Sequence, residues 1–304
     1  MTSIQANLIH GYLRFKNFIS PPRKELNLEK QRAELDGYSR IFKPLVELKN
    51  QPVDVDGVPG EWITPPQVGG GRTILYLHGG YYMFGSIKSH HNLAGNIAAA
   101  ARARALIIAY RLAPEHPFPA GLEDALTAYQ WLLAQDIQPG QITLAGDSAG
   151  GGLVLSLLLA LRQRGMALPA AGVCLSPATN LNLSRESWKI NTKKDLLINP
   201  YLADQIIPQY LGDIDPCDPL ASPIFGDLHG LPPLLIHVGS DEVLLSDCEC
   251  FADYARNSGV DVTLEVWPGM QHVFQYFASF VPESRQAIDR IGEFIQTTNQ
   301  APQL

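Results

Sequence analysis

The pentapeptide Gly146-Asp147-Ser148-Ala149-Gly150 places small residues around a single serine hydroxyl, in the pattern G-x-S-x-G. A short β-favouring run precedes it and a leucine-rich stretch follows it, so the sequence predicts a strand, a very tight turn and a buried helix. Glycines two positions before and after the serine avoid collisions with the strand and the helix. Such a turn would present the hydroxyl as a nucleophile, although the same pattern also occurs in ordinary glycine-rich loops.

A serine nucleophile needs a base, and the base needs a carboxylate that fixes its tautomer. When the serine sits on such a turn, the acid and then the base follow it along the chain, each in a loop after a strand. Of the eight histidines, His272 is the one in a loop after the last predicted strand, within the run WPGMQH. His272 is therefore the predicted base.

The acid is expected in the loop 239–244, which follows a buried strand. Asp241 is the first carboxylate beyond that strand, and it is the predicted partner of the histidine. Glu242 is its neighbour, and physical reasoning alone leaves it open as the acid.

The run His78-Gly79-Gly80-Tyr81-Tyr82 follows another buried strand and is the expected source of oxyanion donors. Glycine leaves its N–H open to a developing negative charge, so the predicted donors are the amides of Gly79 and Gly80, joined by that of Ala149. His78 is expected to hold this loop through hydrogen bonds rather than to titrate in catalysis.

Motifs for other chemistries are incomplete. Gly80 and Gly85 have the spacing of a phosphate-binding loop, but the lysine that should follow the second glycine is absent. The sequence contains neither HExxH nor a dinucleotide fingerprint, and its four cysteines form no CxxC pair. Neither a metal nor a cofactor is expected.

The elements that must position these loops follow an alternating pattern from about residue 52. Short β-favouring runs alternate with helical stretches, which predicts a mainly parallel sheet with helices on both faces. Loops at the carboxyl ends of such strands meet at one edge, where open α/β sheets bind ligands. The strands are expected at residues 53–55, 61–64, 73–77, 105–110, 141–145, 171–176, 234–238 and 262–267.

Almost sixty residues separate the strands near 176 and 234, which breaks the alternation. They contain a predicted helix in which Asn199 caps, Pro200 takes the first turn and Gly212 ends it, with Pro208 inside. An insertion at this point is expected to lie above the ligand-binding edge of the sheet.

The first fifty residues are predicted to form a unit of their own. They carry nine Lys/Arg and five Asp/Glu, a net charge of +4, whereas the remaining residues carry 14 and 25, a net charge of −11. Helical spacing predicts one helix over 4–19, stopped by Pro21-Pro22, and a more polar helix over about 25–40. We expect the apolar stripe of the first helix to pack on the protein's own body; the alternative is a mobile lid or an amphipathic helix that touches a membrane. The stripe consists of Ile4, Leu8, Tyr12, Phe15 and Ile19.

Composition indicates a globular chain of 304 residues, 46% hydrophobic and 17% charged. The net charge of −7 argues against nucleic acid as a partner. The longest uncharged apolar run, 149–161, is too short to span a bilayer, and basic residues interrupt the apolar start of the chain. A cytoplasmic location without stable membrane insertion is expected, and a homodimer is possible.

Several motifs together resemble the hormone-sensitive-lipase group of bacterial carboxylesterases. They are LHGGYYMFGS (77–86), YRLAPEHPFPA (110–120), LAGDSAGG (144–151), DPLASP (218–223), PPLLIHVGSDEVLLSD (232–247) and WPGMQH (267–272). Within this group, the oxyanion loop and the ending WPGMQHVFQ are most similar to monoterpene ε-lactone hydrolases. The resemblance covers about residue 40 to the end.

This resemblance implies an α/β-hydrolase fold with two parts: N-terminal cap helices in 1–50, and a catalytic domain in 51–304 with a cap insertion at about 180–215. It implies a Ser148, Asp241 and His272 triad with oxyanion donors Gly79, Gly80 and Ala149. Tyr81 replaces the third glycine of the family's HGGG loop and narrows the space beside the hole. The residues expected to contact the substrate are Tyr81, Tyr82, Asp147, Trp188, Leu197 and Ile207.

The predicted activity is cofactor-free hydrolysis of short-to-medium acyl esters, small-molecule substrates, through an acyl-enzyme intermediate. The same triad could serve a lactone hydrolase or an amidase. The alternative from another class is a non-catalytic small-molecule receptor on this fold, which loss of a triad member would mark. All three predicted members are present.

Overall fold

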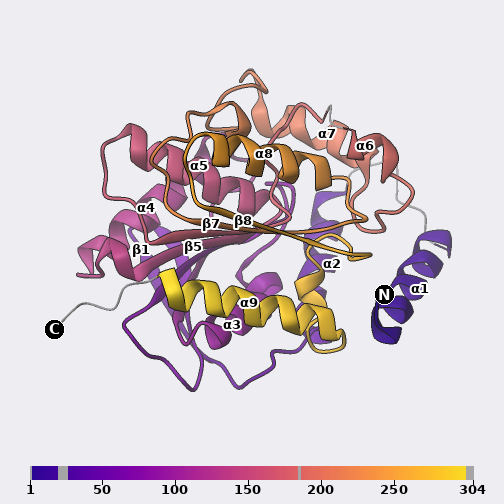
Figure 1. Ribbon diagram of the computed structural model, residues 1–304, viewed down its shortest axis with the longest axis horizontal. Coiled ribbons are helices and arrows are strands. Elements are labelled where there is room, and N and C mark those ends of the chain that lie inside the picture. Colours follow the sequence, from indigo (N-terminus) through magenta and orange to yellow (C-terminus); the bar gives the residue numbers. More distant parts are fainter. Residues whose placement is uncertain (1, 20–26, 184–185, 299–304) are drawn as a thin grey trace.

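The computed structural model describes residues 2–19, 27–183 and 186–298. Its centre is an eight-stranded sheet in the order β1-β2-β4-β3-β5-β6-β7-β8, shown in Figure 1. The strands β3 to β8 pair in parallel, whereas β1 and β2 pair antiparallel with each other and β2 pairs antiparallel with β4. The strands are β1 (Lys49–Val55), β2 (Val58–Thr64), β3 (Thr73–Leu77), β4 (Arg104–Ile108), β5 (Ile142–Asp147), β6 (Ala171–Leu175), β7 (Leu234–Gly239) and β8 (Val262–Trp267).

Helices cover both faces of this sheet, as predicted for a mainly parallel α/β fold. Apart from Arg104 at the start of β4, the residues of the central strands β3 to β7 are buried, which matches their continuous apolar runs. One face is covered by α4 (Ala120–Ala134), α5 (Ala149–Gln163) and α8 (Leu245–Asn257), the other by α3 (Ile87–Ala100) and α9 (Pro282–Thr298) (Figure 1). Separate apolar clusters fill the two sides.

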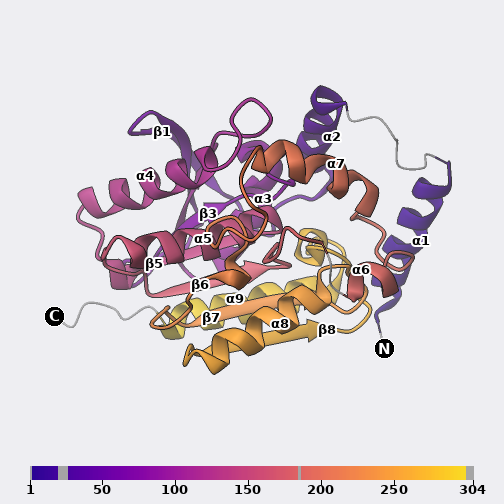
Figure 2. The same ribbon diagram turned by 90° about the horizontal axis from the view of Figure 1, so that it is seen from above.

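The remaining helices gather near the end of the molecule where β8 finishes (Figure 2). They are α1 (Ile4–Ile19), α2 (Leu28–Ile41) and, from the insertion between β6 and β7, α6 (Ser187–Ile190) and α7 (Pro200–Leu211). The Asn199 side chain caps α7 through the N–H of Tyr201, and Gly212 ends the helix with φ +60°, as predicted. These helices therefore lie at the carboxyl edge of the sheet, beside the predicted catalytic loops.

The expectation for the apolar stripe of α1 is wrong. Its five residues are all more than 60% exposed, and the buried residues of the helix are Ala6 and Leu13 on the opposite side. The helix lies at the margin of the molecule and presents this narrow face to Met270, Phe274 and Phe277. The prolines expected to stop it, at 21 and 22, lie outside the described residues.

Candidate active site

The predicted nucleophile occupies a strained turn between β5 and α5. Ser148 has φ +54° and ψ −120°, a backbone conformation that residues other than glycine rarely adopt. A Cβ atom on Gly146 would lie 2.5 Å from the carbonyl oxygen of Gly150, and one on Gly150 would collide with the carbonyl of Leu77. The two glycines therefore make the close contact of strand, turn and helix possible, as the sequence predicted.

The base predicted from the sequence is bonded to a carboxylate. Nδ1 of His272 lies 2.8 Å from Oε2 of Glu242, which is completely buried. The second oxygen of Glu242 accepts hydrogen bonds from the Ser176 hydroxyl at 2.8 Å and from the Gly239 amide at 2.5 Å. Every polar atom of this buried carboxylate is therefore paired, which fixes its orientation toward the imidazole.

Asp241 is not the partner of the histidine, contrary to the prediction. It is only partly buried, and its Oδ1 lies 3.3 Å from the hydroxyl of Ser240. The strand β7 continues one residue further than predicted, to Gly239, and the turn that follows directs Glu242 back under the loop. The first carboxylate after the strand consequently points away, and the second carboxylate points in.

The surroundings of His272 set its proton affinity. Burial lowers the pKa, but the hydrogen bond and charge of Glu242, followed by the charges of Asp195 and Asp147, raise it more, so the pKa lies above the usual 6.5. Among the described residues, no second hydrogen bond holds the ring. Nε2 is consequently the nitrogen available to exchange a proton with a serine or a leaving group.

The amide of Gly79 is already engaged, which contradicts its predicted role as an oxyanion donor. It lies 3.1 Å from Oδ1 of Asp147 and 3.2 Å from Nε2 of His90. The amides of Gly80, Tyr81 and Ala149 have no hydrogen-bond acceptor in the described parts of the chain. These three N–H groups, rather than that of Gly79, are the ones open to an oxyanion.

Asp147 was predicted to contact the substrate, but its role in the site is structural. It is almost fully buried and accepts a hydrogen bond of 2.7 Å from the Tyr76 hydroxyl besides that from Gly79. Burial opposes its ionisation, but the nearby His90 and the Tyr76 hydroxyl outweigh burial and lower its pKa. Burial, together with His90, lowers the pKa of His78 to about 3, so this ring is neutral and holds the loop through the Gly79 carbonyl.

An apolar cavity of about 40 Å³ opens beside Ser148. Four of the predicted contact residues line it, namely Tyr81, Tyr82, Trp188 and Ile207. Leu197 does not; it packs in the cluster that includes the inner face of α1. The hydroxyl of Tyr81 accepts the N–H of Asn199 at 3.2 Å, so the residue that replaces the family's third glycine ties the loop to the start of α7.

The cap insertion is hydrogen-bonded to both catalytic loops through residues 191–198, here termed the cap segment. Asn191 donates to the carbonyls of Ser240 and Glu242 at 3.1 and 2.9 Å. Asp195 accepts the amide of Val243 at 3.0 Å and that of Ile198 at 2.8 Å. Asn191 and Asp195 therefore hold the acid loop on both sides of Glu242, at Ser240 before it and at Val243 after it.

The same cap segment also binds the loop of the base. Gln271, the residue before His272, accepts the amide of Leu196 at 2.7 Å and donates to the carbonyl of Lys194 at 3.1 Å. Sequence reasoning missed these roles because Asn191 and Asp195 belong to no motif. The one available signal was their polarity within an insertion expected to cover the site.

The site combines a strained serine at a strand–turn–helix junction with a histidine and a buried carboxylate on later loops of a mainly parallel sheet. This combination defines a serine hydrolase of α/β type. The chain belongs to the α/β-hydrolase fold family, whose sequence model matches residues 74–276. More narrowly, it is a serine carboxylesterase of the hormone-sensitive-lipase type.

Known relatives support this placement. The chain is 43% identical to an acetyl-hydrolase of Streptomyces hygroscopicus, over 90% of this chain and 93% of that one. It is 37% identical to an esterase of Acinetobacter venetianus, over 90% and 91% of the two chains. A solved esterase of the bacterial hormone-sensitive-lipase family superimposes with a TM-score of 0.93 and 43% identity, covering 99% of this chain and all of that one. Such relatives indicate small-molecule esters as substrates.

No helix within 2–19, 27–183 and 186–298 combines the length and apolar character needed to cross a membrane. Over the same ranges, no group of three or more His, Cys, Asp or Glu side chains is arranged to hold a metal ion.

Proposed function

We propose that this carboxylesterase acts through Ser148, His272 and Glu242, with oxyanion donors Gly80, Tyr81 and Ala149. The observation that carries the proposal is the 2.8 Å contact between His272 Nδ1 and the buried carboxylate of Glu242. A carboxylate at Nδ1 fixes the tautomer in which Nε2 is unprotonated, and this tautomer is needed for a base.

In this mechanism Nε2 of His272 takes the proton of Ser148 as the serine oxygen attacks the ester carbonyl. Glu242 stabilises the imidazolium that forms, and the three amides stabilise the oxyanion of the tetrahedral intermediate. The imidazolium then protonates the leaving alcohol, which departs and leaves the acyl-enzyme. A water molecule, deprotonated by the same nitrogen, releases the acid and regenerates the serine.

The cavity beside Ser148 supports a short-to-medium acyl chain. Its volume of about 40 Å³ is small, and Trp188, Ile206 and Ile207 form part of its wall. The apolar lining favours an alkyl group over a charged one. We expect kcat/KM to be highest among acetate to hexanoate esters and to fall for longer chains.

Paired substitutions test the assignment on a p-nitrophenyl ester panel from acetate to palmitate, with ε-lactones and anilides included. Ser148→Ala should abolish turnover, by about 10⁶ in kcat. Glu242→Gln should cost roughly 10⁴ in kcat by favouring the wrong tautomer, whereas the matched neighbour Asp241→Asn should stay within a few fold. The reverse order would return the acid to Asp241. Faster turnover of lactones or anilides than of every ester would identify one of the alternative activities.

A further inference from the structure

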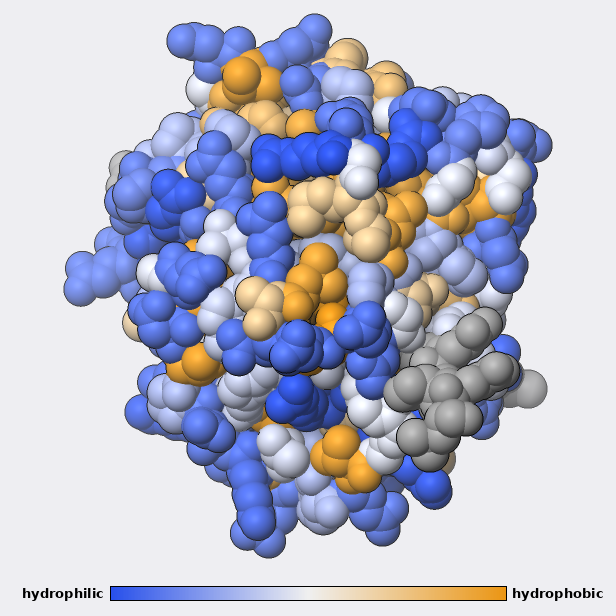
Figure 3. All heavy atoms as spheres, turned by 90° about the vertical axis from the view of Figure 1, so that its left-hand side faces the viewer, coloured by the Kyte–Doolittle hydropathy of each residue, from blue (hydrophilic) through white to orange (hydrophobic). Residues whose placement is uncertain are grey.

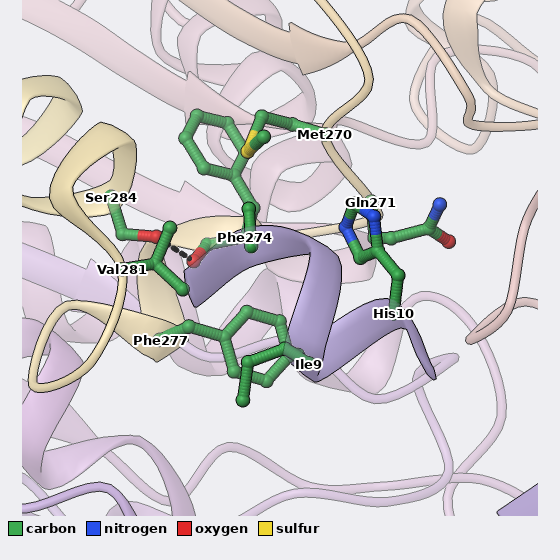
Figure 4. A pocket seen from close by; sticks show the side chains of 9 residues that line it. Ile9, His10, Met270, Gln271, Phe274, Phe277, Val281 and Ser284 are labelled. Atoms are coloured by element: carbon green, nitrogen blue, oxygen red, sulfur yellow. Dashed lines mark hydrogen bonds between the residues drawn. The ribbon is translucent and has the colours of Figure 1, made fainter. Parts of the chain in front are cut away.

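The helix α1 has one face attached to the protein and another that no described residue covers. Its inner face packs Ile9, with the buried Ala6 and Leu13, against the loop after β8 and the turn before α9. Figure 4 shows Ile9 and His10 directed toward Met270, Phe274 and Phe277 around a small cavity of about 10 Å³. The first turn is held by Ser3, whose amide and hydroxyl donate to Glu283 at 2.6 and 2.8 Å.

The outer face is a broad apolar surface. Six large apolar side chains on it are between 61% and 85% exposed. At about 100° per residue, they fall within an arc of about 120° around the helix axis. By contrast, apolar residues form small separate groups on the opposite end of the molecule, the face seen in Figure 3. The outer face consists of Ile4, Leu8, Tyr12, Phe15, Phe18 and Ile19.

Positive charges border this outer face on both sides. Arg14 lies next to one edge of the arc and Lys16 next to the other, each about 40° beyond the last apolar residue. Both are exposed, and α1 contains no acidic residue. An exposed apolar strip with basic residues along both borders is the pattern of a helix that lies in a lipid–water interface.

We propose that α1 binds the surface of an anionic lipid bilayer, with the outer face at the acyl boundary and Arg14 and Lys16 on the phosphate groups. Lipid satisfies both features at once, because it offers apolar chains beneath a layer of negative charge. A second copy of this chain fits less well. Two outer faces packed on each other would bring their basic borders together, with no acidic residue in α1 to pair with them.

Binding in this way would place the catalytic loops close to the membrane surface. The inner face of α1 contacts Met270, two residues before His272, and Asn17 donates to the carbonyl of Leu196 in the cap segment at 2.9 Å. The ester substrates would then include ones dissolved in a bilayer. The binding itself is independent of the proposed catalytic assignment, so either can fail without the other.

Cosedimentation of the full chain with lipid vesicles tests the proposal. Wild type should bind vesicles of phosphatidylcholine with one-quarter phosphatidylglycerol, and bind pure phosphatidylcholine at least about tenfold less, with added salt weakening the former. The double variants Leu8→Glu/Phe15→Glu and Arg14→Glu/Lys16→Glu should each lower the partition coefficient by about tenfold or more. Phe225→Glu, at an apolar residue outside α1 that is 43% exposed, should bind as wild type does.

Each variant alters exposed side chains, so unchanged circular dichroism and melting temperature verify that it folds. The proposal is overturned if wild type does not bind anionic vesicles, or if the α1 variants bind as well as wild type. It is also overturned if size-exclusion chromatography finds a dimer that Leu8→Glu/Phe15→Glu converts to a monomer, because the outer face would then bind a second copy.

Discussion

At the scale of single residues, three carboxylates set the electrostatic surroundings of His272. Glu242 binds it directly, whereas Asp195 and Asp147 act at longer range. A protonated imidazole cannot accept the serine proton, so activity is lost as the pH falls through the raised pKa. We therefore expect kcat/KM to rise with pH to a plateau, with a midpoint above 6.5.

Asp195→Asn isolates the contribution of the cap to this ionisation. Removing the charge should move the midpoint of the kcat/KM profile downward, and losing an acceptor for the Val243 amide should lower kcat more than it changes KM. Asp204→Asn, the same change on an exposed residue of α7, should leave the profile in place. If Asp195→Asn lowers the melting temperature but not the midpoint, its role is purely structural.

The sequence predicted the serine and the histidine because their order and loop positions follow from the topology. It favoured Asp241 over Glu242 as the acid, and this choice was wrong, since one further residue of strand and one turn decide which side chain faces the imidazole. The engagement of Gly79 was equally hidden. That amide is bound by Asp147, 68 residues away, and only the pairing of β3 with β5 brings the two together.

At the scale of elements, Arg32 provides the charged part of the attachment of α2 to the body, beside the hydrogen bond between Asp36 and Ser86 and the packing of Leu35. Arg32 donates to the carbonyls of Met83 and Ala113 at 2.9 and 3.1 Å and forms two hydrogen bonds of 2.8 Å with Glu115. The hydrogen bond from Arg32 is the main reason why the pKa of Glu115 falls to about 2. A carboxylate with a depressed pKa stabilises the fold above its unfolded value of about 4.5, and this contribution is lost as the pH falls toward 2.

Two substitutions separate the ion pair of Arg32 with Glu115 from the hydrogen bonds that Arg32 donates to the two backbone carbonyls. Glu115→Gln should lower the free energy of unfolding at pH 7 by less than about 1 kcal/mol, since the pair is half exposed. The melting temperature should therefore fall only slightly. That difference should shrink between pH 4.5 and pH 3. Arg32→Met should cost more at pH 7, and part of its effect should persist at pH 3, because the two carbonyls lose their donor at any pH. Equal, pH-independent losses would contradict this division.

The helices also show what periodicity can and cannot predict. The spacing of apolar residues in α1 correctly predicted a helix, because the pattern depends on local geometry alone. It did not predict which side is covered, since a small face of Ala6 and Leu13 makes the contact and the larger stripe stays outside. The start and the end of α7 were predictable, because its capping Asn199, the proline of its first turn and its terminal Gly212 act locally.

For the whole molecule, the cap segment depends on hydrogen bonds more than the sheet does, although Leu196, Leu197 and Ile198 also pack in apolar clusters. Large apolar clusters on both faces hold the sheet with its helices. The cap segment is joined to the catalytic loops by hydrogen bonds, each contributing about 0.5–1.5 kcal/mol net. Local opening of such a segment needs less free energy than global unfolding. The site should therefore lose its geometry before the sheet does.

Urea titration followed by two signals measures this difference. We expect esterase activity to disappear at a lower urea concentration than the helical circular dichroism at 222 nm. Gln271→Ala, which removes both bonds from the base loop to the cap segment, should move the activity midpoint further down and the dichroism midpoint much less.

Gln296→Ala is the matched control. Its amide donates to the Ala100 carbonyl at 2.8 Å on the other face of the sheet, so both midpoints should fall together. Coincident midpoints in wild type, or equal shifts in Gln271→Ala, would mean that the cap and the sheet unfold as one unit.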